Sequence, residues 1–107
     1  MATIKNNHYL KVQNRFPEFI EAVESLGSTA RGAGVIDEKN SQLVQLAGAA
    51  AIRSEGAVHS HTRRALEAGA GTGEIYHALI LLVSTIGFPN VMAALSWAED
   101  VIESSEE

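Results

Sequence analysis

RSEGAVHSHTRRALEAG, residues 53–69, concentrates most of the polar chemistry of this chain. It holds two histidines, two acidic residues and three arginines, whereas the segments on either side are long and apolar. Val58, Ala65 and Leu66 recur at helical spacing, and Gly69 is a typical C-terminal stop. We predict a helix over residues 56–68, and its short apolar face leaves room for polar side chains to point inward.

Apolar residues at helical intervals predict four further helices, and no stretch shows the alternation typical of a strand. Pro17 suits the first position of a helix, Asp37 and Thr72 are suitable N-caps, and Gly87 ends the fourth helix. The fold is therefore predicted to be all-α, with helices over residues 17–26, 38–53, 56–68, 72–86 and 89–102. Residues 27–35 are expected to form a connection or a frayed turn.

The longest uncharged segment runs from Ile75 to Ala98, which is long enough to cross a bilayer. Pro89 interrupts it and would leave backbone groups unpaired in lipid, so we predict two helices of a soluble protein and no membrane contact. The unbroken apolar run from Leu79 to Val83 predicts that this helix is the most buried one, or is shared with a second subunit.

Composition limits the class of protein. The 107 residues carry a net charge of −5, and the basic residues are dispersed, which argues against nucleic-acid binding. There is no cysteine, so thiolate catalysis, disulfides and cysteine-based metal sites are excluded. The first residues lack an apolar signal core, which predicts a cytoplasmic protein.

The predicted organisation is one domain with two short flanks. Residues 1–15 are polar and are expected to form an N-terminal arm, residues 16–103 the helical domain, and residues 104–107 an acidic tail. Because an alanine-rich core of this size is thin, a homo-oligomer is a reasonable way to complete it.

The order of the motifs resembles the carboxymuconolactone decarboxylase family, which also contains the alkylhydroperoxidase D proteins. The resemblance covers roughly residues 16–102. It rests on four pieces of sequence, IDEK with QLVQLA, then HTRRALEAGA, then EI, then GFP, at residues 36–39, 42–47, 61–70, 74–75 and 87–89. It implies an AhpD-like helical bundle of about five to six helices that assembles as a homo-oligomer, with a trimer or hexamer expected.

The family resemblance divides into two chemistries. The peroxidase branch has a Cys-x-x-Cys pair, a His four residues later and a Glu on the preceding helix, which here fall at Ser54, Ala57, His61 and Gln42. A serine hydroxyl cannot replace a thiolate that attacks a peroxide, so thiol peroxidase activity is not expected. The decarboxylase branch lacks the cysteines and keeps the histidine. It releases carbon dioxide from a carboxylated muconolactone and uses no metal or organic cofactor.

Decarboxylation requires a group that holds a carboxylate and a group that delivers a proton. The candidate catalytic residues are His61 as general acid or base, with Glu55 and Ser54. The candidate residues that bind a small carboxylated or lactone-like substrate are Arg64, Arg53, His59 and Gln42. The alternative is a non-catalytic oligomeric binding or scaffold protein that has lost the redox site.

No metal site is predicted. His59 and His61 are two positions apart, and such positions point about 200° apart on a helix, so they cannot share a metal ion. Glu55 and His59 are four residues apart and are expected to form a pair on another face of the helix from His61.

Overall fold

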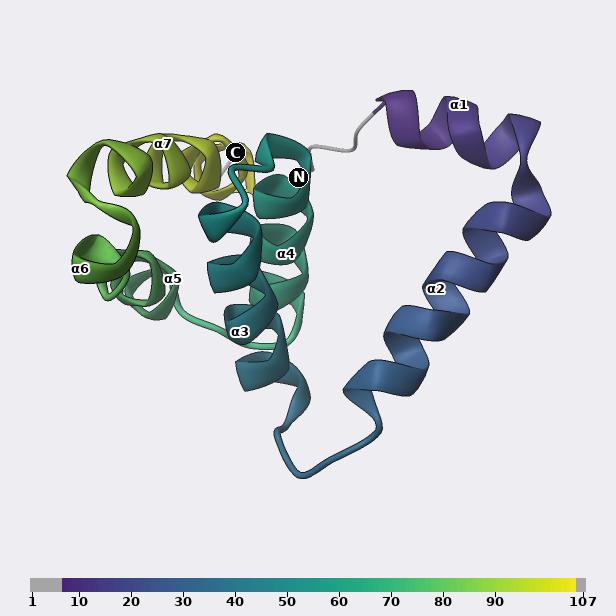
Figure 1. Cartoon of the computed structure of the whole chain (residues 1–107), viewed down its shortest axis with the longest axis horizontal. Coiled ribbons are helices and arrows are strands. Elements are labelled where there is room, and N and C mark those ends of the chain that lie inside the picture. Colours follow the sequence, from purple (N-terminus) through teal and green to yellow (C-terminus); the bar gives the residue numbers. More distant parts are fainter. Residues whose placement is uncertain (1–6, 106–107) are drawn as a thin grey trace. The chain divides into compact units, whose positions relative to one another are not determined.

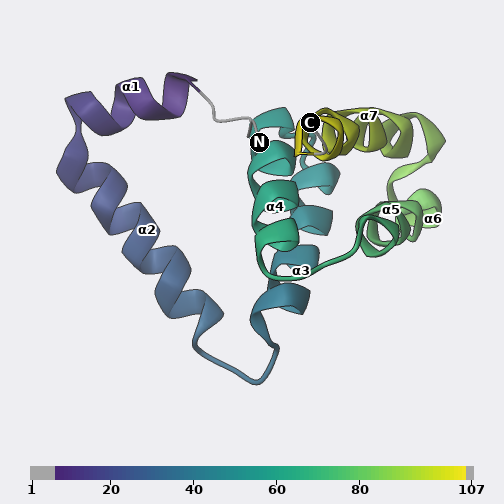
Figure 2. The same ribbon diagram turned by 180° about the vertical axis from the view of Figure 1, so that it is seen from behind.

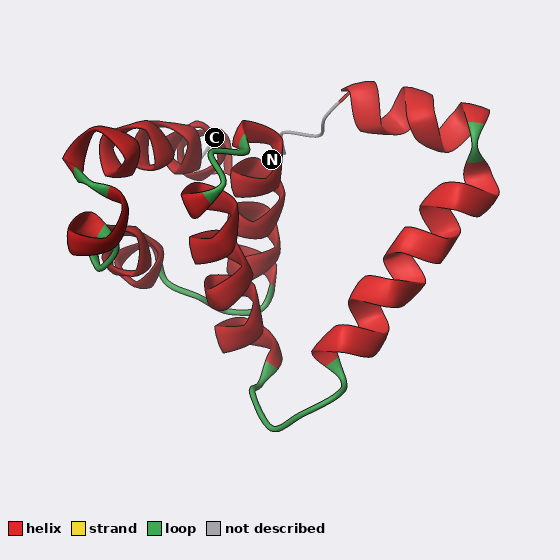
Figure 3. Cartoon of the chain, in the orientation of Figure 1, coloured by secondary structure: helices red, strands yellow, loops and turns green. Residues whose placement is uncertain are grey.

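The structure, a computed structural model, describes residues 7–105, and all regular elements in this range are helices (Figures 1 and 3). The all-α prediction is therefore confirmed. The helices are α1 (Asn7–Arg15), α2 (Pro17–Arg31), α3 (Glu38–Ala51), α4 (Glu55–Glu67), α5 (Thr72–Ile80), α6 (Val83–Ile86) and α7 (Phe88–Ser105).

The chain divides into two compact units, with the boundary between Asp37 and Glu38. The first contains α1 and α2, and the second contains α3 to α7. The predicted limits of an arm at 1–15 and a domain at 16–103 do not coincide with this boundary, and they stay a prediction. Residues 7–15 of the expected arm form helix α1, which has no buried side chain.

Helix α2 is longer than predicted. It begins at Pro17 as expected, but continues through Gly27 to Arg31, so the expected end at Gly27 is wrong. One glycine inside a helix costs only about 1 kcal/mol, which neighbouring helix-forming residues can offset. Gly32 is the C-cap, and its N–H donates to the carbonyl of Ser28.

Helices α3 and α4 lie side by side in the second unit, and α7 packs against α4 (Figures 1 and 2). Their contact faces are built mainly from small residues, which lets the helices approach closely. The buried apolar core of this unit consists of Leu46, Ala49, Ala50, Val58, Ala65, Ala70, Ile75, Leu79, Ala94, Ala98 and Ile102. Packing in this core fixes which side of α4 faces α3 and which side faces α7.

Both ends of α4 are defined by local hydrogen bonds. Ser54 is the N-cap, and its Oγ accepts a hydrogen bond of 3.2 Å from the N–H of Ala57. At the other end Gly69 has a φ of 97°, and the N–H of Ala70 donates to the carbonyl of Ala65. This is the αL ending that glycine permits, and it confirms Gly69 as the predicted stop.

The segment predicted as one helix over residues 72–86 forms two, α5 and α6, because a turn at Leu81 and Leu82 separates them. The N-cap of α5 is Gly71 rather than Thr72. Gly87, with a φ of 88°, ends α6 as predicted, and α7 begins one residue before Pro89.

The expectation that residues 79–83 form the most buried helix is wrong within this chain. Only Leu79 is buried, whereas Ile80, Leu81 and Val83 are 49%, 64% and 45% exposed. Helical spacing directs Ile75 and Leu79 to the core and turns the intervening apolar residues outward. The other expectation, contact with a second subunit, stays a prediction.

None of the described helices has both the length and the apolar character needed to span a membrane.

Thr62 supports a stability prediction. Its side chain on α4 is fully buried, and its Oγ1 has no hydrogen-bond partner among the described residues. An unpaired buried hydroxyl is unfavourable by about 1–3 kcal/mol. We therefore expect Thr62→Val, which keeps the shape and removes the hydroxyl, to raise the free energy of unfolding by about 1 kcal/mol in urea denaturation.

Thr62→Ser keeps the hydroxyl and loses a methyl group, so it should be less stable than the original chain. An equal loss in both variants would contradict the argument.

A second prediction concerns Glu74 on α5. Its carboxylate accepts hydrogen bonds of 2.9 Å from the N–H of Gly71 and from Lys39 on α3. These two hydrogen bonds, the backbone one foremost, lower the pKa of Glu74. A lowered pKa stabilises the fold above the unfolded value of about 4.3, and this stabilisation is lost as the pH falls through the folded value. We expect Glu74→Gln to reduce the urea midpoint at pH 7, and the difference from the original chain to shrink steadily below about pH 4. A difference independent of pH would show that the charge is not involved.

Candidate functional site

Gln42 and His61 are in direct contact between α3 and α4. The ring Nδ1 of His61 lies 2.9 Å from Oε1 of Gln42. Gln42 is only 1% exposed, and it shares the buried face of α3 with Leu46, Ala49 and Ala50. A buried amide needs hydrogen-bond partners for both its oxygen and its nitrogen. The orientation of the Gln42 amide therefore decides whether His61 faces an acceptor or a donor.

Glu38, one turn earlier on α3, determines that orientation. The Nε2 of Gln42 donates a hydrogen bond of 2.8 Å to Oε1 of Glu38. An ionised carboxylate only accepts, so the amide nitrogen must face Glu38 and the amide oxygen must face His61. We therefore expect His61 to carry a proton on Nδ1, which would leave Nε2 as the basic nitrogen of the neutral ring. We call this arrangement the Glu38–Gln42–His61 chain.

Ser54 is in a structural position. Its hydroxyl oxygen caps α4 by accepting a hydrogen bond from the N–H of Ala57. The hydroxyl thus accepts from the backbone at the end of the helix that carries His61. A catalytic role for Ser54 stays a prediction.

The two candidate arginines differ in their surroundings. Arg53, in the turn between α3 and α4, has a positive φ of 59°, and its guanidinium donates to the side-chain oxygen of Asn90 on α7. Arg64 is half-buried on α4, three residues after His61. Positions three apart are neighbours on a helix surface, so Arg64 is on the side of His61, whereas Arg53 is tied to α7.

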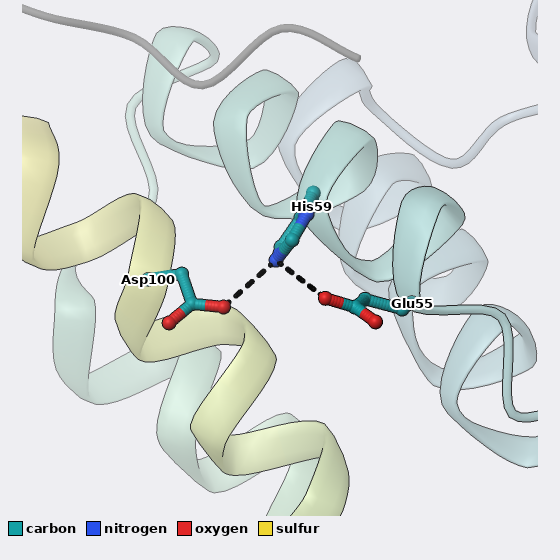
Figure 4. A group of neighbouring side chains, drawn as sticks. All are labelled: Glu55, His59 and Asp100. Atoms are coloured by element: carbon teal, nitrogen blue, oxygen red, sulfur yellow. Dashed lines mark hydrogen bonds and ion pairs between the residues drawn. The ribbon is translucent and has the colours of Figure 1, made fainter. Parts of the chain in front are cut away.

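Glu55 and His59 lie on a different face of α4 from His61, as the spacing predicted. Figure 4 shows the ring of His59 between Asp100 of α7 and Glu55. The Nε2 of His59 is 3.0 Å from Oδ2 of Asp100 and 3.9 Å from Oε2 of Glu55. The two histidines therefore contact different helices, His59 contacting α7 and His61 contacting α3.

The structure thus separates the predicted site residues into two groups. Gln42 and His61 are together, and so are Glu55 and His59, but the two pairs do not form one constellation. Sequence reasoning missed Glu38 and Asp100. The spacing of Glu38 and Gln42, four apart, could have indicated the first contact, whereas no local signal connects Asp100 to residues 41 positions earlier.

The comparisons with known proteins agree with this fold. The sequence pattern of the carboxymuconolactone decarboxylase family matches residues 17–100. The chain belongs to the carboxymuconolactone decarboxylase family. It is 33% identical over 84 residues to an uncharacterized protein of Methanocaldococcus jannaschii, an alignment that covers 78% of each chain.

A solved structure in the family is also similar. The apo crystal structure of a carboxymuconolactone decarboxylase family protein from Legionella pneumophila aligns with a TM-score of 0.77 at 26% identity. The alignment covers 92% of this chain and 88% of that one. The likeness to the carboxymuconolactone decarboxylase family stated from the motifs is therefore confirmed, and the Glu38–Gln42–His61 chain lies within the matched region.

The Glu38–Gln42–His61 chain predicts the tautomer of His61. Neutral His61 should carry its proton on Nδ1, and Gln42→Leu, which removes the accepting oxygen, should abolish this preference. Ring ¹⁵N shifts recorded by NMR above neutral pH distinguish a protonated from an unprotonated ring nitrogen. Exposed His77 on α5 provides the control, because its ring shifts should not change in the Gln42 variant. A proton found on Nε2 of neutral His61 in the original chain would contradict the assignment.

Proposed function

We propose that the protein is a cofactor-independent lyase of the decarboxylase type, acting on a small carboxylated or lactone-like substrate. The observation that carries the proposal is the Glu38–Gln42–His61 chain, because it holds one histidine in a defined tautomer. A surface histidine without a role would need no buried amide to orient it. Membership of the carboxymuconolactone decarboxylase family supports the same reaction class.

In the proposed reaction the bond between the substrate carbon and its carboxylate breaks, and carbon dioxide leaves. The electron pair stays on the carbon as an enolate, which then takes a proton. His61 delivers this proton from Nε2 while Nδ1 remains bonded to Gln42. The neutral amide of Gln42 and the carboxylate of Glu38 together stabilise the protonated ring before the transfer, and Nε2 is reprotonated from solvent afterwards.

Arg64 is the proposed partner of the substrate carboxylate. It follows His61 by three residues on the same helix, so a substrate held by its guanidinium would lie near the ring. Arg53 is the weaker candidate, because its guanidinium already donates to Asn90. Glu55 and His59 face α7, so we leave them out of this mechanism.

Thiol peroxidase chemistry is not part of the proposal. The chain contains no cysteine, and the positions of the redox pair hold Ser54 and Ala57. Neither side chain can form the thiolate that attacks a peroxide or the disulfide that follows. Turnover of an alkyl hydroperoxide is therefore not expected.

The second candidate function is that of a non-catalytic oligomeric binding or scaffold protein. Gln42 supports it, because an amide cannot titrate where the peroxidase branch has an acid. Exposed apolar side chains support a homo-oligomer in either case. In the second unit they include Val44, Ile52, Ile80, Leu81, Val83, Phe88 and Met92, and in the first unit they include Phe16, the N-cap of α2, and Phe19, Val23 and Leu26 on α2. Their burial between copies would form the proposed trimer or hexamer.

Release of carbon dioxide from carboxymuconolactone and a panel of related carboxylated lactones tests the lyase proposal. We expect turnover by the purified chain, and a loss of about 10²- to 10⁴-fold in kcat for His61→Ala, the usual contribution of a general acid. Arg64→Met should mainly raise KM, because it removes a contact to the substrate carboxylate. His77→Ala is the matched control and should retain full activity.

The same variants separate the two candidate functions. His61→Ala should have the mass of the original oligomer in light scattering, so that lost turnover reports on chemistry and not on assembly. Turnover that survives His61→Ala would remove His61 from the mechanism. Failure of every carboxylated lactone, together with an intact oligomer, would favour the scaffold or binding protein.

A further inference from the structure

A second cluster of polar side chains lies apart from the Glu38–Gln42–His61 chain. It consists of Glu55 and His59 on α4 and Asp100 on α7, shown in Figure 4, and we call it the α4–α7 cluster. One ligand-type atom from each residue lies within 4.8 Å of the other two. The ring of His59 is largely covered, at 18% exposure of its side chain, whereas the two carboxylates reach solvent at 58% and 50%.

The charges of this cluster do not balance. Both carboxylates approach the same ring nitrogen, Nε2 of His59, at 3.0 and 3.9 Å. One N–H can donate one good hydrogen bond, so it serves Asp100 and leaves Glu55 at a longer distance. Among the described residues neither carboxylate has another hydrogen-bond or ion-pair partner. Two negative charges therefore converge on a group that offers at most one positive charge.

We propose that the α4–α7 cluster binds a zinc ion through Nε2 of His59, Oδ2 of Asp100 and Oε2 of Glu55. An imidazole nitrogen with two carboxylates is a donor set that suits zinc, and a doubly charged cation balances the two acids. Three protein ligands leave the fourth tetrahedral position to a water molecule, on the side where the carboxylates are exposed. The ion takes the place of the Nε2 proton of His59.

The distances fit this coordination. Bonds of about 2.0–2.2 Å to zinc place neighbouring ligand atoms of a tetrahedron about 3.4 Å apart. The observed separations of 3.0 and 3.9 Å from Nε2 lie on either side of this value. The more distant ligand, Glu55, is also the most exposed of the three, so a change of its side-chain rotamer can close the difference without moving the backbone.

Helix α4 supplies two of the three proposed ligands. Glu55 and His59 are four residues apart, so both project from one face of α4. Asp100 comes from α7, which packs against α4 through the buried core. Zinc at this point would connect the two helices, and it lies on a different face of α4 from His61. The proposal therefore stands apart from the proposed lyase function, and it replaces the prediction that the chain has no metal site.

Isothermal titration of zinc chloride into the full-length chain tests the proposal. The protein must carry no histidine tag and be treated with a chelator beforehand, because a tag would bind the same ion. We expect saturable binding of one zinc ion per chain. His59→Ala and Asp100→Asn should each weaken the affinity by about tenfold or more, since each removes one of the three ligands.

His77→Ala is the matched control, because His77 is an exposed helical histidine outside the cluster and should bind zinc as the original chain does. Asp100→Asn keeps the shape of the side chain, so it remains informative if His59→Ala fails to fold. Zinc in about 100-fold excess over Kd should raise Tm by about 5 °C or more in the original chain and in His77→Ala, and much less in Asp100→Asn. Absence of saturable binding, or equal affinity in the His59 and Asp100 variants, would overturn the proposal.

Discussion

The buried amide of Gln42 is the constraint on which the arrangement around His61 depends. At 1% exposure this side chain has no access to bulk water, so both ends of the amide must find partners inside the protein. Glu38 accepts from one end and His61 donates to the other. Because a carboxylate cannot donate, the direction of every bond in the chain follows from one charged residue at the start of α3. A polar side chain in the core of α3 thereby determines the protonation pattern of a histidine on the neighbouring helix α4.

Helix α4 separates two chemistries because its residues advance by about 100° each. His61 faces α3, and His59, two positions earlier, faces α7. The same helix can therefore carry the proposed proton-transfer group on one side and the proposed zinc ligands on the other without contact between them. The N-cap at Ser54 and the αL ending at Gly69 define where the helix starts and stops. A shift by one residue would turn both histidines away from their partners.

The sequence was a good guide to what is local and a poor one to what is distant. Spacing and turn chemistry predict the all-α fold and the helix boundaries at Pro17, Gly69 and Gly87. They also predict that His59 and His61 point in opposed directions. Gly27 does not end α2, because a glycine ends a helix only where the following residues do not continue it. The burial of the apolar run over residues 79–83 does not follow from the sequence, for another reason. Its composition is uniformly apolar, so composition alone could not tell which residues face the core. The contact between Asp100 and His59 could not be predicted from the sequence, because it depends on the packing of α7 on α4.

An amide at position 42 gives the site more than one property that an acid there would not give. A glutamate at position 42 would place a second carboxylate one turn from Glu38, where like charges four residues apart repel each other. A glutamate at position 42 would also lack the amide N–H that now donates to Glu38. Glu38 could then no longer orient the side chain at position 42. Glu38 and Gln42 therefore form a matched pair, with the neutral side chain at the buried position and the charged one at the exposed position. This placement gives His61 a hydrogen-bond acceptor without the cost of burying an ionised carboxylate beside it. An arrangement of this kind suits a histidine that exchanges protons with a substrate, because the acceptor on Nδ1 stays neutral through the cycle.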